Sequence, residues 1–586
     1  MPVVKSRPHL RIVLSLLMLV VVTVSFLSWQ AGVRYEGFLK RQLPLWVSKA
    51  SGGVYKITVR DVHVGITGRR IRLRGIHIWP DDTRLSAIRQ TGAAPKRLFE
   101  ARIDEMELRG TVWEALVTDS VLTSRRLRVH NPSITVLEGR DTGKLADQPG
   151  AGSGFQGISI RNVEVDGIVL RYYRRNSLGN LDASSTGGRL TAADFQIHRN
   201  EQGKMQQISR ALVLTLGLIR MQAAGSKYRL WADSLAWTPA DTQVQVHRFG
   251  LEPVAHLKNQ HVQYQLHIRH GILHGFSVSH TLRQRNIEMS ELTLEGAQLQ
   301  VATDRRMPRS LPLRRALFPQ ELLRLAPIPI HIGMVRIYQS DIVYREASAR
   351  TGLQGQFSFD DLRGTISPVV GGTSMHAIGK SQISVQLNGV FQQHSAMEAR
   401  ANLSLNDSLN AFDLRARLKG LEDYQVRGLA KALGLIDITS LHVDSADFHV
   451  WGNNSGTSCR FRGEYQDLRV QILKMDTLTR AMQKRGLLSF VANRIVLHSS
   501  NPLPGSSVRQ AASYLHRDTT EPFFRGLWKS LFECVLQTTI ADRTALERAK
   551  QKAATKPQRL QERQRRREER RRRREARRAR KDDAVL

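Results

Sequence analysis

The chain has 586 residues, of which 41% are hydrophobic and 24% charged, a composition that permits large folded domains and excludes a wholly disordered polymer. Its two cysteines, Cys459 and Cys534, exclude a disulfide framework and a cysteine-rich metal cluster, and leave open whether the two pair with each other. The net charge of +36 is uneven, because residues 556–581 hold fifteen Lys and Arg against four Glu.

Residues 12–29 contain no charged side chain. As a helix, a segment of this length would rise about 27 Å, close to the roughly 30 Å hydrocarbon core of a bilayer. A cleaved signal peptide is the alternative, but its apolar core spans about 7 to 15 residues, and no small-x-small cleavage site occurs near Ser28. The segment therefore predicts an uncleaved, single-pass membrane anchor. Basic residues on its two sides nearly balance, and the positive-inside rule leans only slightly toward an inside N-terminus.

The segment after the anchor, residues 34–53, shows apolar residues at helical spacing, including Tyr35, Phe38, Leu43 and Val47. This pattern predicts a short amphipathic helix. Two placements stay open: the helix lies in the membrane interface, or it plugs the end of the first sheet.

The stretch Val54–Pro80 predicts β-strands with one apolar face. Apolar residues alternate with charged ones at Ile71 and Leu73, and again at Ile76 and Ile78, on the two sides of Gly75. This hinged unit returns at residues 127–136, 163–170, 292–299, 335–344 and 441–450. Because the spacing between units is irregular, we expect a long meander rather than a regular solenoid. About 25 strands at ~4.8 Å would extend roughly 120 Å. An ordinary set of β-sandwiches remains the alternative.

Helical patterns are few and fall at seams. They cover residues 311–325, which precede two prolines, and residues 425–435 and 523–538. Residues 150–157 and 182–189 are rich in small and polar residues and predict loops. The resulting division is an anchor (1–33), an amphipathic helix and linker (34–53), a first β half (54–310), a helical junction (311–330), a second β half (331–540) and an Arg-rich tail (541–586).

The motifs that could indicate covalent chemistry or metal binding lack the flanking secondary structure that such sites require. Gly152–Gly157 matches a dinucleotide fingerprint in letters, but a polar loop precedes it and a strand pattern follows it. His267, His270 and His274 have ligand-like spacing, yet on a regular strand the first two would point to opposite faces, which favours histidines of the polar face. The expectation is a protein without enzymatic activity, with no catalytic residue, no metal site and no cofactor.

The tail predicts contact with anionic surfaces. Its densest run comprises Arg570, Arg571, Arg572, Arg573 and Arg574. Such a charged helix or disordered arm would hold lipid headgroups, at about 1 kcal/mol per basic residue, or nucleic acid. No aromatic residue interleaves with the arginines, which weakens the case for single-stranded nucleic acid. A solvated charge run without one dedicated ligand is the other interpretation.

Taken together, several phrases resemble the AsmA-like cell-envelope proteins. Besides the anchor and the Ser51-Gly-Gly53 entry into the strands, they are residues 304–308, 328–346, 355–367, 490–502 and 526–531, and the resemblance spans residues 35–540. It implies a protein of the inner membrane of a Gram-negative cell with its β-rich body in the periplasm. It also implies an architecture similar to the chorein-type bridge-like lipid transfer proteins and passage of phospholipid toward the outer membrane, or support of outer-membrane assembly with an outer-membrane protein as partner.

These expectations combine into one fold class and one site. The fold class is mainly β: an elongated, curved antiparallel β-meander that forms an open hydrophobic groove, with an N-terminal transmembrane helix, short amphipathic helices at seams and a charged helical or disordered tail. Phospholipid acyl chains would contact the inward residues Ile71, Leu73, Ile76, Ile78, Val163, Val165, Ile168, Leu170, Leu292 and Leu294.

The function hypotheses differ in their tests. Aspartate at Leu73 or Val165 would block lipid passage if these residues line a groove. Loss of activity on truncation after Ala545 would instead assign the function to the tail. A third hypothesis, a scaffold or translocation module for outer-membrane proteins, would give crosslinks to polypeptide rather than lipid.

Overall fold

The structure is a computed structural model of the chain. It describes residues 43–45, 47–48, 51–65, 69–90, 97–110, 121–138, 157–174, 182–199, 205–222, 226–254, 262–278, 281, 286–307, 315–349, 351–372, 382–475, 482–484 and 497–540. The predicted anchor, the fingerprint match at Gly152–Gly154 and the arginines of the tail lie outside these residues.

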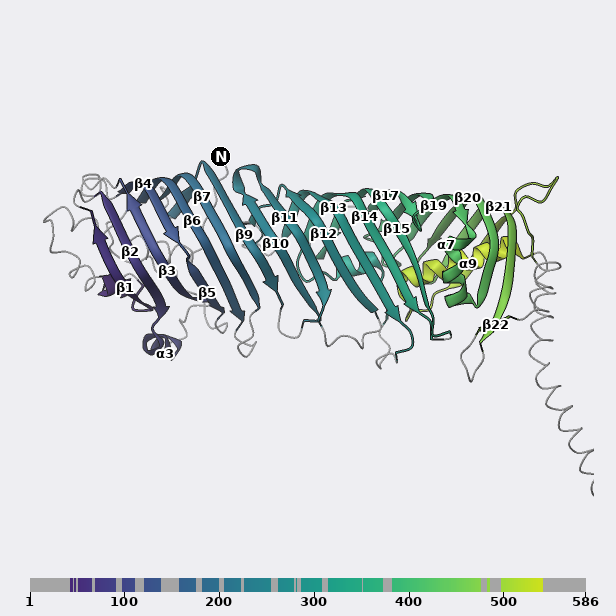
Figure 1. The fold of residues 1–586 in the computed structure, drawn as a ribbon, viewed down its shortest axis with the longest axis horizontal. Coiled ribbons are helices and arrows are strands. Elements are labelled where there is room, and N and C mark those ends of the chain that lie inside the picture. Colours follow the sequence, from purple (N-terminus) through teal and green to yellow (C-terminus); the bar gives the residue numbers. More distant parts are fainter. Residues whose placement is uncertain are drawn as a thin grey trace, which may run out of the picture.

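The described chain is mainly β and forms one long sheet (Figure 1). The strands of its first part are β1 (Tyr55–Val64), β2 (Arg70–Pro80), β3 (Arg97–Arg109), β4 (Val121–His130), β5 (Ser133–Glu138), β6 (Gly157–Arg174), β7 (Ala183–Arg199), β8 (Met205–Ile208), β9 (Ala211–Met221), β10 (Tyr228–Thr238), β11 (Gln243–Pro253), β12 (Val262–His274) and β13 (Ile287–Asp304). Those of its second part are β14 (Ile330–Ala347), β15 (Gln354–Ser367), β16 (Val369–Gly371), β17 (Gln382–Phe391), β18 (Ser395–Ser404), β19 (Phe412–Glu422), β20 (Ile436–Gly452), β21 (Gly456–Met475), β22 (Met482–Lys484) and β23 (Gln510–His516).

Strands follow one another across the sheet in chain order, mostly as antiparallel neighbours. The exceptions are β6, which runs parallel to β4 and β5, and β14, which runs parallel to β13. The β13–β14 pairing continues the sheet across the predicted junction. At four places across the sheet, two successive strands pair with the same neighbouring strand, as β4 and β5 do with β3, and together they count as one position. The described strands therefore fill 19 positions, roughly 90 Å at ~4.8 Å each, which is shorter than the predicted 120 Å.

The hinge of the repeated unit is a local break in the strand ladder that neighbouring strands share, which we call the bulge. Between β1 and β2 the pairing skips one residue on each strand, Arg60 and Gly75, and the register is the same on both sides. Ile71, Leu73, Ile76 and Ile78 therefore all lie on one face and are all buried. An extra residue reverses the two-residue alternation, which explains the shift in the sequence pattern. Residues with positive φ mark this bulge line on many strands: Gly75, Asn131, Gly167, Gly187, Leu218, Arg248, Gly296, Gln339 and Asp361.

Two glycines on this line provide a matched test of the bulge geometry. Gly167 and Gly187 have φ of 66° and 71°, but a Cβ at Gly167 would collide with the Asn131 side chain, whereas one at Gly187 has no neighbour within 4 Å. Gly187→Ala should cost about 1–2 kcal/mol of unfolding free energy from backbone strain alone. Gly167→Ala should cost clearly more, as measured by urea unfolding. Equal losses would contradict the bulge contact.

Helices lie at seams and ends. The described ones are α3 (Asp82–Gln90), α6 (Pro319–Arg324), α7 (Asp423–Leu429) continued by the π-helix η5 (Ala430–Gly434), and α9 (Phe523–Thr539), with a 3-10 turn η2 (Pro239–Asp241). Residues 43–45 and 47–48 are also helical. The predictions over residues 425–435 and 523–538 are confirmed. The helix predicted at 311–325 is only partly correct, since residues 315–318 are not helical and 311–314 are not described. Helix α3 was not predicted.

One predicted loop and one predicted orientation are wrong. Residues 183–189 belong to β7 rather than to an exposed loop, because hydrogen bonds to β6 and β9 hold this small-residue segment in the sheet. His267 pairs with Gly250 and His270 pairs with His247. Both histidines lie on the polar face, because Arg269 between them is skipped in the pairing and the side chains of the two histidines then point to the same side.

Packed clusters fill the two ends of the apolar face. At the β1 end, Leu43 and Val47 from the segment before β1 are buried among residues of β1 to β7. At the β21 end, α9 packs against β20, β21 and β23, and α7 with η5 packs against β15 and β20 (Figure 1). Leu43 and Val47 thus close the end of the first part of the sheet, as one of the two predicted placements of the amphipathic segment has it. Among the described helices, none has both the length and the apolar character needed to cross a bilayer.

Candidate functional site: the apolar face of β10 to β13

Directly paired residues on neighbouring strands point to the same face, so the register defines rows of side chains that cross the strands. One row runs from β1 to β21 through every strand position, and all its members are hydrophobic in a chain that is 41% hydrophobic. Its members are Val62, Leu73, Met106, Val129, Val165, Leu190, Leu214, Trp237, Val244, Leu273, Leu292, Val335, Ile366, Val385, Ala401, Leu414, Val450 and Cys459. The sheet therefore carries an uninterrupted apolar line along its long axis.

In the middle of the sheet, four such rows cross β10 to β13, which we name the apolar grid. Two rows lie on one side of the bulge line and two on the other. They are Trp237, Val244, Leu273 and Leu292; Leu235, Val246, Gly271 and Leu294; Ala232, Phe249, Ile268 and Ala297; and Leu230, Leu251, Leu266 and Leu299. Gly271 is the one position of the grid without a side chain.

The apolar grid differs from both ends of the face in its exposure. The four packed clusters of the described residues contain no residue of β10 to β13. Apart from Ala232, Val244, Gly271 and Ala297, the grid residues are only half-buried, including the large side chains of Trp237 and Phe249. Apolar surface that is only partly covered is costly in water and is typical of a site that another apolar molecule covers.

The opposite face carries charges in alternating order. Arg72 faces Glu107, Glu107 faces Arg128, and Arg128 faces Glu164. The Arg128 Nε lies 2.8 Å from a Glu164 carboxylate oxygen. In the middle of the sheet, the His247 and His270 rings stack at 4.5 Å, and the Arg269 Nη2 lies 2.7 Å from Glu295 Oε1. This face is charged and internally paired, so the two faces differ sharply in polarity.

No group of three or more His, Cys, Asp or Glu side chains in the described part of the chain is arranged to hold a metal ion. His267 Nε2 lies instead 3.2 Å from Glu252 Oε1, which also accepts a hydrogen bond from the Trp231 indole at 3.1 Å. These histidines thus take part in the polar network of the charged face.

All ten predicted lining residues lie on the apolar face, but in different surroundings. Ile71, Leu73, Ile76 and Ile78 are at most 5% exposed in the β1-end cluster, and Val163 and Ile168 are also buried. Val165 packs against this cluster and Leu170 is half-buried. Leu292 and Leu294 belong to the apolar grid. An aspartate at Leu73 would therefore test the folding of the β1 end rather than lipid passage.

Most of the apolar grid escaped the sequence analysis because its hinges are not glycine. Strands β10, β11 and β12 carry Asp233, Arg248 and Arg269 at the bulge line. The signal was nevertheless present in the sequence, as two apolar pairs separated by one extra polar residue: Leu230 and Ala232, then Leu235 and Trp237. Searching for this shift in alternation, rather than for glycine, would have found these strands.

A buried ionic cluster lies where α9 meets the apolar face. Glu346, 4% exposed on β14, pairs with Arg525 of α9, lies 3.6 Å from Arg305 and accepts a hydrogen bond from the Tyr344 hydroxyl at 2.8 Å. Arg525 also donates to Glu521 at 3.0 Å. Burial favours the neutral form of Glu521, but hydrogen bonds from Lys529 and Arg525 outweigh it and hold the pKa of Glu521 below its usual value.

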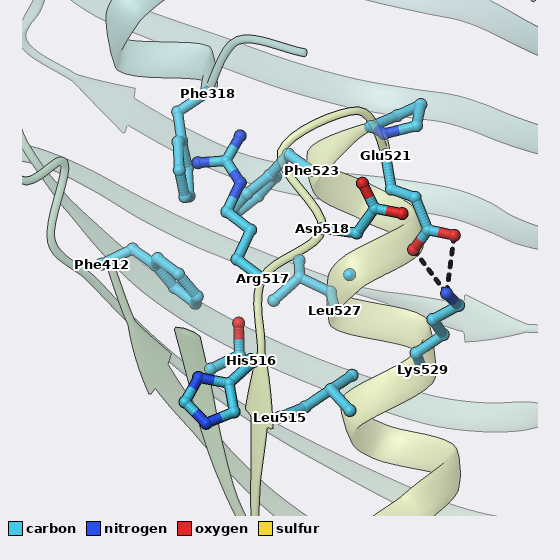
Figure 2. Close-up of a pocket in the computed structure, with 13 residues that line it drawn as sticks. Phe318, Phe412, Leu515, His516, Arg517, Asp518, Glu521, Phe523, Leu527 and Lys529 are labelled. Carbon is cyan, nitrogen blue, oxygen red and sulfur yellow. Dashed lines mark hydrogen bonds and ion pairs between the residues drawn. The ribbon is translucent and has the colours of Figure 1, made fainter. Parts of the chain in front are cut away.

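The same end holds a small pocket of about 100 Å³ at the start of α9. Figure 2 shows Arg517 beside the Phe318 ring, at 3.8 Å from its centroid, and Lys529 paired with Glu521. The Arg517 guanidinium donates to the Ala316 carbonyl at 2.6 Å and to Asn454 at 3.1 Å. Ligand pockets usually measure about 300–1,000 Å³, so this one is better explained by the packing of α9 than by ligand binding.

Comparison with known proteins assigns no family. No family model matches the chain. No curated protein matches it either.

Proposed function

We propose that the protein is a membrane-anchored envelope protein whose apolar face is the floor of an open groove that carries phospholipid between the inner and outer membranes. The inner-membrane anchor, the periplasmic body and an outer-membrane protein as partner belong to this proposal through the AsmA-like resemblance. No residue performs covalent chemistry in it. The tail arginines would contact anionic headgroups at a membrane surface.

The observation that carries the proposal is the partly buried apolar grid between two packed ends. Exposing an acyl chain of about 16 carbons to water costs on the order of 13 kcal/mol at ~0.8 kcal/mol per methylene, so a lipid carrier needs a continuous apolar lining. The four rows of the apolar grid supply such a lining across the middle of the sheet. Headgroups would remain in water at the rim, because the grid contains no charged residue to receive them.

Photo-crosslinking of the full chain in its membrane tests this proposal. A photoreactive side chain at Val246 lies on the apolar grid, while one at the neighbouring Gln245 points to the polar face. We expect crosslinks to phospholipid at Val246, detected as lipid-mass adducts, and none at Gln245. Equal lipid labelling at both positions would contradict an acyl-chain site on this face. Crosslinks from Val246 to polypeptide would instead favour a scaffold for outer-membrane protein assembly.

A further inference from the structure

The only two cysteines of the chain meet in the structure, although 75 positions separate them in the sequence. Cys459 lies on β21 and ends the apolar row, and Cys534 lies on α9. Both side chains are 0% exposed and belong to the same packed cluster.

Ser513 on β23 is a common neighbour of the two cysteines. Cys459 faces Ser513 of β23 across the strand ladder, and the Ser513 hydroxyl donates a hydrogen bond to the Cys534 sulfur at 3.3 Å. The Cys534 sulfur also lies 3.9 Å from the Ala511 carbonyl oxygen. Contact with Cys534 and burial raise the pKa of the Cys459 thiol, while contact with Cys459 lowers the pKa of the Cys534 thiol. Cys459 and Cys534 therefore both lie beside Ser513 within one packed cluster.

We propose that Cys459 and Cys534 form a disulfide bond that fastens α9 to the sheet. The two thiols lose two protons and two electrons as the S–S bond forms. The oxidant is a disulfide, either of a small molecule or of a thiol oxidoreductase, and its own S–S bond breaks to give two thiols. Because both sulfurs are fully buried, exchange takes place before α9 docks or while it is open, and the finished bond is shielded from reductants.

The bond has a direct structural consequence. It closes a long loop and removes conformational freedom from the unfolded chain, which stabilises the folded state. It also holds the helix that fills the β21 end of the apolar face, so that this end stays closed. The inference rests on the contacts of Cys459 and Cys534 and is independent of the proposed lipid transport.

The full chain in detergent is the sample for the test. Free thiols are blocked with N-ethylmaleimide at cell lysis, the protein is digested without reductant, and the peptides are identified by mass spectrometry. A sample found reduced is then incubated with oxidised glutathione in mild urea, which opens α9. We expect a linked peptide pair containing Cys459 and Cys534 in one of these samples. Maleimide or glutathione adducts on both cysteines after this oxidation would overturn the proposal.

Stability measurements separate a disulfide from the packing of two thiols. Cys459→Ala, Cys534→Ala and the double variant should all unfold several degrees below the oxidised wild type, by similar amounts, because either change removes the whole bond. Unfolding the wild type with reductant present should remove most of this difference. A difference that is unaffected by reductant would assign the two residues to packing alone and overturn the disulfide.

Discussion

Gly271→Trp should stop lipid movement along the sheet while leaving the fold intact. Gly271 is the open position of the apolar grid, and the nearest atom to a Cβ built there is the Val246 carbonyl oxygen at 4.0 Å. An indole at this position would occupy the apolar face between Val246 and Leu294. An acyl chain passing it would have to expose at least two methylenes, about 1.6 kcal/mol, which slows transfer more than tenfold.

The measurement is the transfer of labelled phospholipid between donor and acceptor vesicles by the full chain. Two controls accompany it. Gly271→Ala adds one methyl group in ordinary contact and should transfer at the wild-type rate. Gln245→Trp adds the same indole to the polar face of the neighbouring strand and should also leave the rate unchanged. Wild-type transfer by Gly271→Trp would exclude the middle of the apolar face as the lipid path.

Gly271→Trp also distinguishes two modes of transport. A lipid that slides along the whole sheet must pass this position, and the variant then loses transfer while lipid still crosslinks at Val246. A protein that binds one lipid and releases it from the same place would keep its transfer rate. The mutation therefore probes movement along the face rather than binding to it.

Arg525→Ala should destabilise the α9 end by about 3–5 kcal/mol, because it leaves the buried Glu346 carboxylate without its main partner. Glu346 is 4% exposed, and its nearest remaining cation, Arg305, lies 3.6 Å away. The measurement is urea unfolding followed by tryptophan fluorescence, which includes the signal of Trp528 stacked on Phe357 at this end of the sheet. Adding Glu346→Gln should recover much of the loss, because the buried charge is then removed.

A matched surface pair controls for the loss of an arginine in general. Arg363 and Asp361 also form an ion pair, at 3.2 Å, but their side chains are 57% and 52% exposed. Arg363→Ala should therefore change stability by less than about 1 kcal/mol. If Arg525→Ala were no more destabilising than Arg363→Ala, the Glu346 cluster would not hold α9.

The α9 end should also weaken in acid. The pKa of Glu521 in the folded protein lies below its usual value, because Lys529 and Arg525 stabilise the carboxylate against the opposing effect of burial. The stabilisation from this group is complete above the unfolded-state pKa and is lost as the pH falls through the lowered folded-state pKa. In Glu521→Gln, this part of the acid sensitivity should disappear.

Local periodicity was enough to predict the strands and the face that they bury. The shift from Ile71 and Leu73 to Ile76 and Ile78 indicates a bulge, because only an extra residue keeps both pairs on one face. The apolar stripe of α9 could also be predicted, since Leu527, Leu531 and Val535 recur at helical spacing and pack in one cluster. The strand at residues 183–189 could not be predicted in this way, because small residues have little intrinsic preference for strands. Its conformation depends instead on hydrogen bonds to β6 and β9.

By itself, the sequence determined a β-rich chain with one apolar and one polar face, because side-chain alternation is a local property of the backbone. Only the tertiary structure decided which part of the apolar face is covered. Leu73 and Leu292 belong to the same row, yet Leu73 is 1% exposed in the cluster that also contains Leu43 and Val47, while Leu292 is only partly buried. Cys459 and Cys534 likewise meet only because α9 folds back onto the sheet. Burial and contact depend on segments distant in the chain, which local pattern does not encode.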